Sequence, residues 1–138
     1  MKISAGCIVV KVFEGRPHIL LVHAAGNWKN KRFGFPKGEV EPGEDPKEAA
    51  IREVKEETGI KPKIIEYIGS VKTYNKKVIA FLAEVESGKI DDKKRTIEYD
   101  KKEVDVSKFY PVEKAIEMVY EYQKPLFEKA LKLIRRHF

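Results

Sequence analysis

Three glutamates with helical spacing are the residues of this sequence best suited to chemistry. Glu53, Glu56 and Glu57 stand at positions i, i+3 and i+4, so a helix would place their side chains on one arc of its surface. A solvated helix can carry such like charges at a cost of about a few tenths of a kcal/mol per pair. Carboxylate oxygens are also the ligands that Mg²⁺ and Mn²⁺ prefer. The spacing therefore leaves two interpretations, a charged surface helix or a divalent cation site.

A cation held by these glutamates would point to a phosphorylated ligand. Mg²⁺ usually keeps several waters and completes its shell with one or two carboxylates and with substrate phosphates. Lys37 directly precedes Gly38 in the segment FPKG, where it is either a phosphate contact or a loop lysine in water. Lys72, Lys76 and Lys77 lie near a predicted hairpin turn and are weaker candidates for the same contact.

The segment that carries the glutamates has the signals of a helix from residue 46 to residue 58. Asp45 is a good N-cap, Pro46 suits the first helical position, and Gly59 can take the left-handed conformation that ends a helix. Arg52 lies one turn before Glu56 and can pair with it. The apolar residues fall on a neighbouring arc that should face the core: Ala50, Ile51 and Val54.

Strands and helices alternate along the rest of the chain. Aliphatic or β-branched runs predict strands at residues 3–12, 18–24, 63–74, 77–86 and 104–112, with a turn at residues 75–77. Helical periodicity predicts helices at residues 111–122 and 124–138, split by Pro125. A polar and aromatic loop at residues 25–38 precedes the glutamate helix. This order predicts one α/β domain over residues 1–138, with a central mixed sheet covered by helices on both faces.

Composition limits the location and the partners. The single Cys7 fits a reducing compartment, no apolar run approaches the roughly 20 residues of a membrane span, and no signal peptide is recognisable. We therefore expect a cytoplasmic protein without a membrane partner. The net charge of +6 fits an ordinary solvated surface rich in Lys and Glu, or attraction to a polyanion. The charge is spread along the chain without a block of Lys and Arg, so a polyanionic partner would more readily be a small phosphorylated ligand than nucleic acid. Nothing in the sequence fixes an oligomeric state.

The residues from Gly38 to Ile60 carry a family signature. Gly38 is followed by five residues and Glu44, then by seven residues and the run REVKEETGI at 52–60. This segment resembles the signature of the Nudix hydrolases, a Gly, a Glu and Arg-Glu-apolar-any-Glu-Glu-any-Gly-apolar with that spacing. All nine specified positions match. The resemblance implies a Nudix-like α/β/α sandwich that hydrolyses nucleoside diphosphates linked to another group, using Mg²⁺ or Mn²⁺.

The resemblance also assigns roles to residues. Metal ligands would be the carboxylates of Glu53, Glu56 and Glu57 and the backbone carbonyl of Gly38. Arg52 would orient the carboxylates, while Glu44 and Gly59 would hold the loop and the end of the helix. The base that takes the proton from water would be either a helix glutamate, Glu53, or a glutamate of a later loop. Glu103, which would also reach the metal, is the candidate in that loop, with Glu98 as its competitor.

Within the superfamily, two further segments resemble the diadenosine tetraphosphate hydrolase branch: FPKGEVEPGE at 35–44 and KPLFEKAL at 124–131. Glu103 also stands where that branch has a glutamate. We therefore expect asymmetric cleavage of diadenosine tetraphosphate to ATP and AMP. The alternatives are another Nudix pyrophosphatase, acting on a damaged nucleoside triphosphate, ADP-ribose or a capped RNA end, and a nucleotide-binding module without catalysis.

A nucleobase needs a flat partner on which to stack. Tyr74 and Tyr122 are candidates for this contact, as are Trp28 and Phe33, although Phe33 and Phe35 fit the core better. The branch often has a tryptophan shortly before FPKG, whereas this sequence has Phe33 there and Trp28 farther upstream. The adenine contacts of the branch therefore do not transfer residue by residue.

Overall fold

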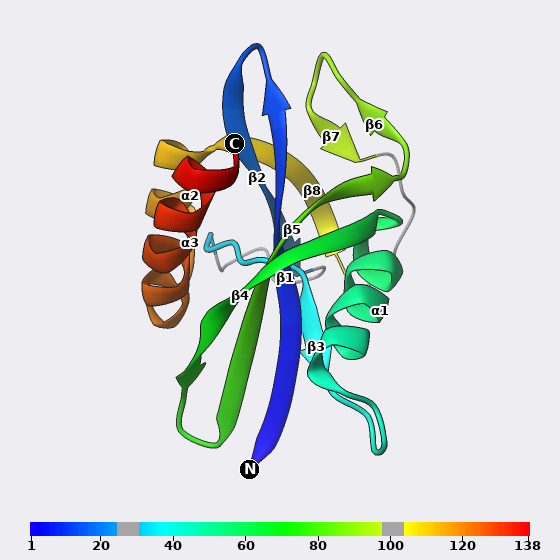
Figure 1. The fold of residues 1–138 in the computed structure, drawn as a ribbon, viewed down its shortest axis with the longest axis vertical. Coiled ribbons are helices and arrows are strands. Elements are labelled where there is room, and N and C mark those ends of the chain that lie inside the picture. The colour runs from blue at the N-terminus through cyan, green and yellow to red at the C-terminus, as the bar shows by residue number, and fades with distance from the viewer. Residues whose placement is uncertain (25–30, 98–103) are drawn as a thin grey trace.

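The computed structural model describes residues 1–24, 31–97 and 104–138, which form one sheet and the helices that cover it (Figure 1). The strands are β1 (Lys2–Phe13), β2 (Arg16–Ala24), β3 (Lys37–Glu39), β4 (Lys61–Lys72), β5 (Lys76–Ser87), β6 (Ile90–Asp91), β7 (Thr96–Ile97) and β8 (Val104–Pro111). The helices are α1 (Pro46–Thr58), α2 (Val112–Met118), the short 3₁₀-helix η1 (Glu121–Gln123) and α3 (Lys124–His137).

The sheet is mixed, as the sequence predicted. Its strand order is β4-β5-β1-β2-β8-β7-β6, and β3 pairs with β1 outside this path. The central pair, β1 with β5, is parallel, while β1 pairs antiparallel with both β2 and β3. A parallel pair needs a crossover connection, and the chain between β1 and β5 includes α1 and the edge strand β4.

Helices lie on both faces of the sheet, with α1 on one side and α2 and α3 on the other (Figure 1). Successive residues of β1 serve the two cores because side chains alternate along a strand. Ile8 and Val10 belong to the cluster that includes α3, and Cys7 and Val9 belong to the cluster that includes α1. The α/β/α sandwich expected from the sequence is confirmed.

Strand β1 changes its partner halfway along its length. Residues 10–13 pair with β2, but residues 4–6 pair with β3. The segment 33–36 enters between β1 and β2 at this point. There the amide of Cys7 donates to the carbonyl of Pro36 at 3.2 Å, and Val22 and Gly34 exchange two backbone hydrogen bonds of 2.8 and 3.1 Å. The change of partner opens the sheet and places residues 33–39 beside α1.

The structure departs from the sequence predictions at four places. The three-residue strand β3 is too short to leave a sequence pattern. The helix predicted over 111–122 ends at Met118, because the backbone of 118–120 pairs with Phe33 through hydrogen bonds of 3.0 and 3.1 Å. In α1, Ala49 rather than Ile51 is fully buried beside Ala50 and Val54. The turn predicted at 75–77 is also shorter, since β5 already begins at Lys76.

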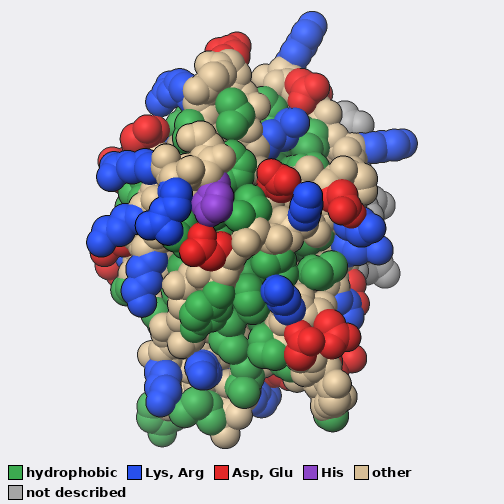
Figure 2. Space-filling model, in the orientation of Figure 1, with side chains coloured by type: hydrophobic (Ala, Val, Ile, Leu, Met, Phe, Trp, Pro, Cys, Tyr) green, Lys and Arg blue, Asp and Glu red, His purple; other side chains and the backbone are tan. Residues whose placement is uncertain are grey.

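The surface charges are mixed. Figure 2 shows basic side chains along the α3 side of the molecule and acidic side chains over α1, interspersed with residues of the opposite sign. Among the described residues, no helix is long and apolar enough to cross a membrane.

We expect Gly6→Ala to destabilise the fold through the contact that opens the sheet. A Cβ atom at Gly6 would collide with the carbonyl oxygen of Pro36 and with Lys37, so the backbone of one strand would have to move. Overpacking of this kind costs about 1–3 kcal/mol. The matched control is Gly15→Ala, where φ is +76° but no atom lies within 4 Å, so the cost is limited to about 1–2 kcal/mol of backbone strain.

Denaturant unfolding of the two variants measures the difference. Gly6→Ala should lose more of the free energy of unfolding than Gly15→Ala. Equal losses would show that the Gly6 contact does not constrain the fold.

Candidate active site

Helix α1 positions the glutamates, and its two ends are capped as the sequence predicted. The carboxylate of Asp45 accepts hydrogen bonds from the amides of Lys47 and Glu48 at 2.8 and 3.1 Å. Gly59 has φ +72° and donates its amide to the carbonyl of Lys55 at 2.9 Å. The capped helix fixes where Glu53, Glu56 and Glu57 project.

Arg52 is the centre of the charge network on this helix. Its Nε and Nη2 donate to the two carboxylate oxygens of Glu44 at 2.8 and 3.0 Å. Its Nη1 donates to Glu53 at 2.8 Å and to Glu56 at 3.2 Å. Its Nη2 also donates to the carbonyl of Glu39 at 2.9 Å. One guanidinium therefore ties two helix glutamates to the loop that precedes the helix.

The network holds Glu44 in its charged form. The hydrogen bonds from Arg52, together with one from the amide of Glu41 at 3.0 Å, lower the pKa of Glu44 to about 2. The same pairing with Glu44 and Glu53 raises the pKa of the Arg52 guanidinium. Only 15% of the Glu44 side chain is exposed, which keeps the pair ordered between loop and helix.

Glu53 lies directly against the backbone of β3. Its side chain is 14% exposed, and a Cβ atom at Gly38 would fall on its carboxylate group. Only glycine leaves room for that approach at position 38. The signature glycine and the first signature glutamate of the helix are thus in contact, although 15 residues separate them in the sequence.

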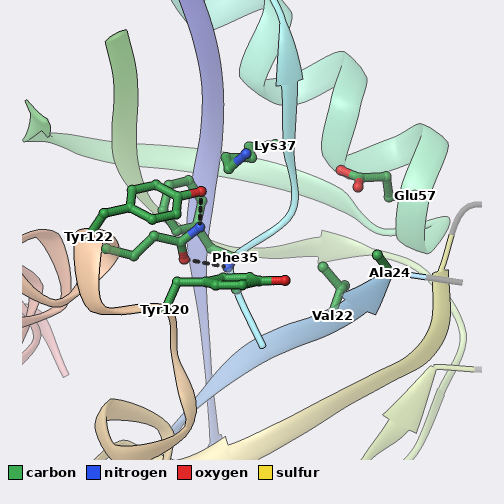
Figure 3. A pocket seen from close by; sticks show the side chains of 9 residues that line it. Val22, Ala24, Phe35, Lys37, Glu57, Tyr120 and Tyr122 are labelled. Atoms are coloured by element: carbon green, nitrogen blue, oxygen red, sulfur yellow. Dashed lines mark hydrogen bonds between the residues drawn. The ribbon is translucent and has the colours of Figure 1, made fainter. Parts of the chain in front are cut away.

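A cleft of about 260 Å³ lies between this helix and the opposite side of the sheet opening (Figure 3). Lys37 and Glu57 line one part of it, and Tyr120 and Tyr122 line the other. The rings of the two tyrosines are 5.8 Å apart and tilted by 34°. The remaining lining residues are Val22, Ala24, Gly34, Phe35 and Gln123. Charged and aromatic groups therefore face one space.

The donor set on α1 fits a hard divalent cation. Glu53 and Glu57 offer carboxylate oxygens close to the cleft and β3, and Glu56, at 48% side-chain exposure, lies beside Arg52. Within residues 1–24, 31–97 and 104–138, no three carboxylate, imidazole or thiol side chains stand close enough together to hold a metal as they are. Arg52 contacts one oxygen of Glu53 and one oxygen of Glu56, so a cation would bind these two carboxylates through their other oxygens.

The structure brings some of the predicted site residues together and leaves others apart. Lys37, Glu57 and Tyr122 share the cleft. Tyr74 is instead fully exposed in the β4–β5 turn, and Lys76 lies at the start of β5, where its backbone is opposite that of Lys2 in β1. Phe35 is buried, and Phe33 packs against Tyr110 and His23. Trp28, Glu98 and Glu103 lie outside the described residues, so their predicted roles stay predictions.

Two polar side chains of the cleft are not predicted by the sequence, those of Tyr120 and Gln123. Tyr120 is two positions from the predicted Tyr122, and Gln123 follows it in the run YEYQ. The sequence feature that indicates them is this pair of tyrosines between two helices, shortly before Pro125. Helical periodicity continues through the run, so the pattern predicts a helix there and not a break.

The chain is similar to known proteins over most of its length. A family model described as the NUDIX domain matches residues 2–130, and the chain therefore belongs to the Nudix family. Members of this family generally use divalent metal ions. A solved structure of an Ap4A hydrolase from Caenorhabditis elegans is 27% identical, with 99% of each chain covered and a TM-score of 0.78.

Two curated relatives match shorter segments. The asymmetrical bis(5'-nucleosyl)-tetraphosphatase of Caenorhabditis elegans is 40% identical over 57 residues, 41% of this chain and 40% of the relative. The ADP-ribose pyrophosphatase of Methanocaldococcus jannaschii is 41% identical over 58 residues, 42% of this chain and 34% of the relative. The matched segment thus spans two fifths or less of either relative.

We expect Glu44→Gln to change the pH dependence of stability. A carboxyl whose pKa falls from an ordinary 4.5 to about 2 on folding stabilises the protein above about pH 4.5, and this stabilisation is lost as the pH falls toward 2. The melting temperature of the wild type should exceed that of Glu44→Gln at pH 6, and the gap should close between about pH 4.5 and pH 2.

The control is Glu128→Gln, at an exposed position of α3. Its melting temperature should follow that of the wild type over the same range. A gap for Glu44→Gln that stays constant with pH would contradict the role given to the Arg52–Glu44 pair.

Proposed function

We propose that this protein hydrolyses diadenosine tetraphosphate asymmetrically, to ATP and AMP, with Mg²⁺ or Mn²⁺ bound at α1. The observation that carries the proposal is the cleft, which has Lys37 and Glu57 on one side and two tyrosines on the other. A nucleotide needs both kinds of surface, since its phosphates attract cations and its base stacks on an aromatic ring. The similarity to the solved Ap4A hydrolase over nearly the whole chain supports the choice of substrate.

The bound cation would neutralise phosphate charge and lower the pKa of a coordinated water. Glu53, Glu56 and Glu57, with the carbonyl of Gly38, are the groups we assign to holding it. Lys37 makes no ion pair with any described residue and lines the cleft, so its ammonium is available to a phosphate oxygen. Arg52 acts indirectly, because it sets the positions of Glu53 and Glu56.

The reaction itself transfers a phosphoryl group to water. The water oxygen forms a bond to one phosphorus, the bridging P–O bond breaks, and the leaving phosphate takes the electron pair. The proton of the attacking water goes to a glutamate, which we assign to Glu103 with Glu53 as the alternative base. Tyr120 would stack on one adenine and Tyr122 would contact the edge of that base, so the base would lie at a fixed distance from the glutamates and one phosphorus would meet the water.

A second candidate is a pyrophosphatase acting on a mononucleotide derivative such as ADP-ribose. The specific observation in its favour is the similarity of a 58-residue segment to the ADP-ribose pyrophosphatase, at 41% identity. The two candidates share the helix, the cation and the bond type. They differ in whether a second nucleotide adds binding energy.

Removing one helix glutamate should strongly reduce turnover and spare the fold. Glu56→Gln and Glu57→Gln each remove a charge that binds the cation, and neither side chain belongs to the apolar face of α1. We expect hydrolysis at saturating Mg²⁺ to fall at least about 10²-fold. Loss of a residue that only supports a metal ligand costs up to about that factor, and loss of a ligand itself should cost no less. Product release measured by chromatography and the circular dichroism spectrum give the two readouts.

The control is again Glu128→Gln, which should turn over like the wild type. If either helix variant keeps near-normal turnover, that glutamate does not hold the cation.

The substrate is tested in ¹⁸O-labelled water. Because one phosphorus would be presented to the water, cleavage of diadenosine tetraphosphate should place the label in only one of the products ATP and AMP. Simple triphosphates and ADP-ribose should have lower kcat/KM, since they lack the remote binding energy of the second nucleotide. A mononucleotide turned over at least ten times more efficiently would replace this substrate assignment with the second candidate.

A further inference from the structure

Gln123 is a buried polar residue that joins the two walls of the cleft. Only 1% of its surface is exposed. Its Oε1 accepts a hydrogen bond from the backbone amide of Phe35 at 3.3 Å, and its Nε2 donates to the hydroxyl of Tyr122 at 2.9 Å (Figure 3). Gly34 makes room for this side chain, because a Cβ atom there would lie 2.9 Å from both amide heteroatoms.

The direction of these hydrogen bonds follows from chemistry. A backbone N–H can only donate, so the amide oxygen of Gln123 must face Phe35. Its NH₂ group must then face Tyr122, and an NH₂ group can only donate. The hydroxyl oxygen of Tyr122 is therefore an acceptor in this bond. Its own hydrogen has to be directed away from Gln123.

That hydrogen has no acceptor in residues 1–24, 31–97 and 104–138. Among the residues that the structure describes, Gln123 is the sole hydrogen-bond partner of the Tyr122 hydroxyl. Tyr122 lines the cleft, and the hydroxyl end of its ring is directed toward Lys37 on the other side (Figure 3). A donor is thus presented to whatever occupies the cleft.

We propose that Gln123 is a positioning residue that commits the Tyr122 hydroxyl to donate a hydrogen bond to an unprotonated ring nitrogen of a bound adenine. The inference rests on the proposed function, in that the cleft receives an adenine nucleotide. Adenine ring nitrogens outside the glycosidic bond carry lone pairs and no hydrogen. A base with an N–H at the same place would meet a second donor, and an unpaired polar contact of this kind is strongly disfavoured.

A merely structural role for Gln123 makes a different prediction. As a buried spacer it would need only to fill volume and pair the Phe35 amide, and the direction of the Tyr122 hydrogen would have no effect on binding. Gln123→Glu separates the two roles at pH 8. A carboxylate still accepts from the Phe35 amide, but its other oxygen accepts from Tyr122, so the hydroxyl turns its lone pair toward the cleft.

The experiment measures the dissociation constant of ATP with Mg²⁺ by calorimetry at pH 8. ATP is the probe because it carries adenine and phosphates whichever nucleotide is cleaved. Tyr122→Phe should weaken ATP binding by up to about tenfold, the loss of one hydrogen bond. Gln123→Glu should weaken it at least as much. Tyr67→Phe, on an exposed tyrosine of β4, is the matched control and should bind ATP like the wild type.

The double variant Tyr122→Phe/Gln123→Glu decides whether the effect passes through the hydroxyl. If it does, adding Gln123→Glu to Tyr122→Phe weakens ATP binding no further. Simple repulsion between the new carboxylate and the phosphates would instead weaken binding equally in both backgrounds, because both of these charges are present in each. That result would overturn the inference.

A second variant guards against misfolding caused by a buried charge. Gln123→Met removes both hydrogen bonds and keeps the volume, so it should weaken ATP binding with Tyr122 present and leave it unchanged in the Tyr122→Phe background. In steady-state assays the single variants should raise KM and leave kcat near that of the wild type, since the contact is remote from the reacting phosphorus.

The remaining outcomes are distinct. Wild-type ATP binding in Tyr122→Phe, or no ATP binding by the wild type, overturns the inference. ATP binding with the expected pattern but no cleavage of diadenosine tetraphosphate leaves the inference standing and removes the substrate assignment.

Discussion

The hydrogen-bonded network of Arg52 is the interaction on which the site depends. Glutamates at helical spacing repel one another, and a helix that gathers them needs a counter-charge. Arg52 provides it to Glu53 and Glu56 on the helix and to Glu44 in the preceding loop. Because the guanidinium presents several donors in a fixed plane, Arg52 can hold all three carboxylates and still bind both oxygens of Glu44 through two parallel donors, a contact that a lysine cannot make.

A second constraint is the opening of the sheet where β1 exchanges β2 for β3. Residues 33–39 fit into this opening because three glycines leave room where a Cβ atom would collide with a neighbouring backbone or side chain. Gly6 lies against Pro36, Gly34 against Gln123 and Gly38 against Glu53. The same segment therefore connects the sheet, the aromatic wall of the cleft and the carboxylate helix. A shift at any of these contacts would move Lys37 relative to the other groups of the cleft.

These two constraints separate the parts of the molecule that carry the family signature from those to which we assign ligand selection. The Arg52 network and the Gly38–Glu53 contact involve signature residues, which fits the match of the family model to residues 2–130. Tyr120, Tyr122 and Gln123 lie outside the signature and form the other wall of the cleft. Related chains can thus share the helix and differ in the nucleotide they accept.

Much of the carboxylate helix could be predicted from the sequence because the interactions that define it are local. Asp45 caps amides two and three residues away, Gly59 ends the helix by its own conformation, and Arg52 reaches Glu56 across one turn. The mixed sheet and its two helical layers were also predictable, since side-chain periodicity records which face of each element is buried. Where periodicity misled, as for Ile51 and the end of α2, tertiary contacts were stronger than the local pattern.

The aromatic wall of the cleft was decided only by the tertiary structure. The bond between Phe35 and Gln123 joins residues 88 positions apart, and no local spacing records such a pair. Tyr74 and Tyr122 were equal candidates in the sequence, but one lies in an exposed turn and the other in the cleft, because the backbone around Phe33 interrupts the helix before Tyr122. The sequence by itself therefore determined the family, the fold class and the charged helix. The residues that face its glutamates across the cleft depend on long-range pairing of the chain, which no short segment encodes.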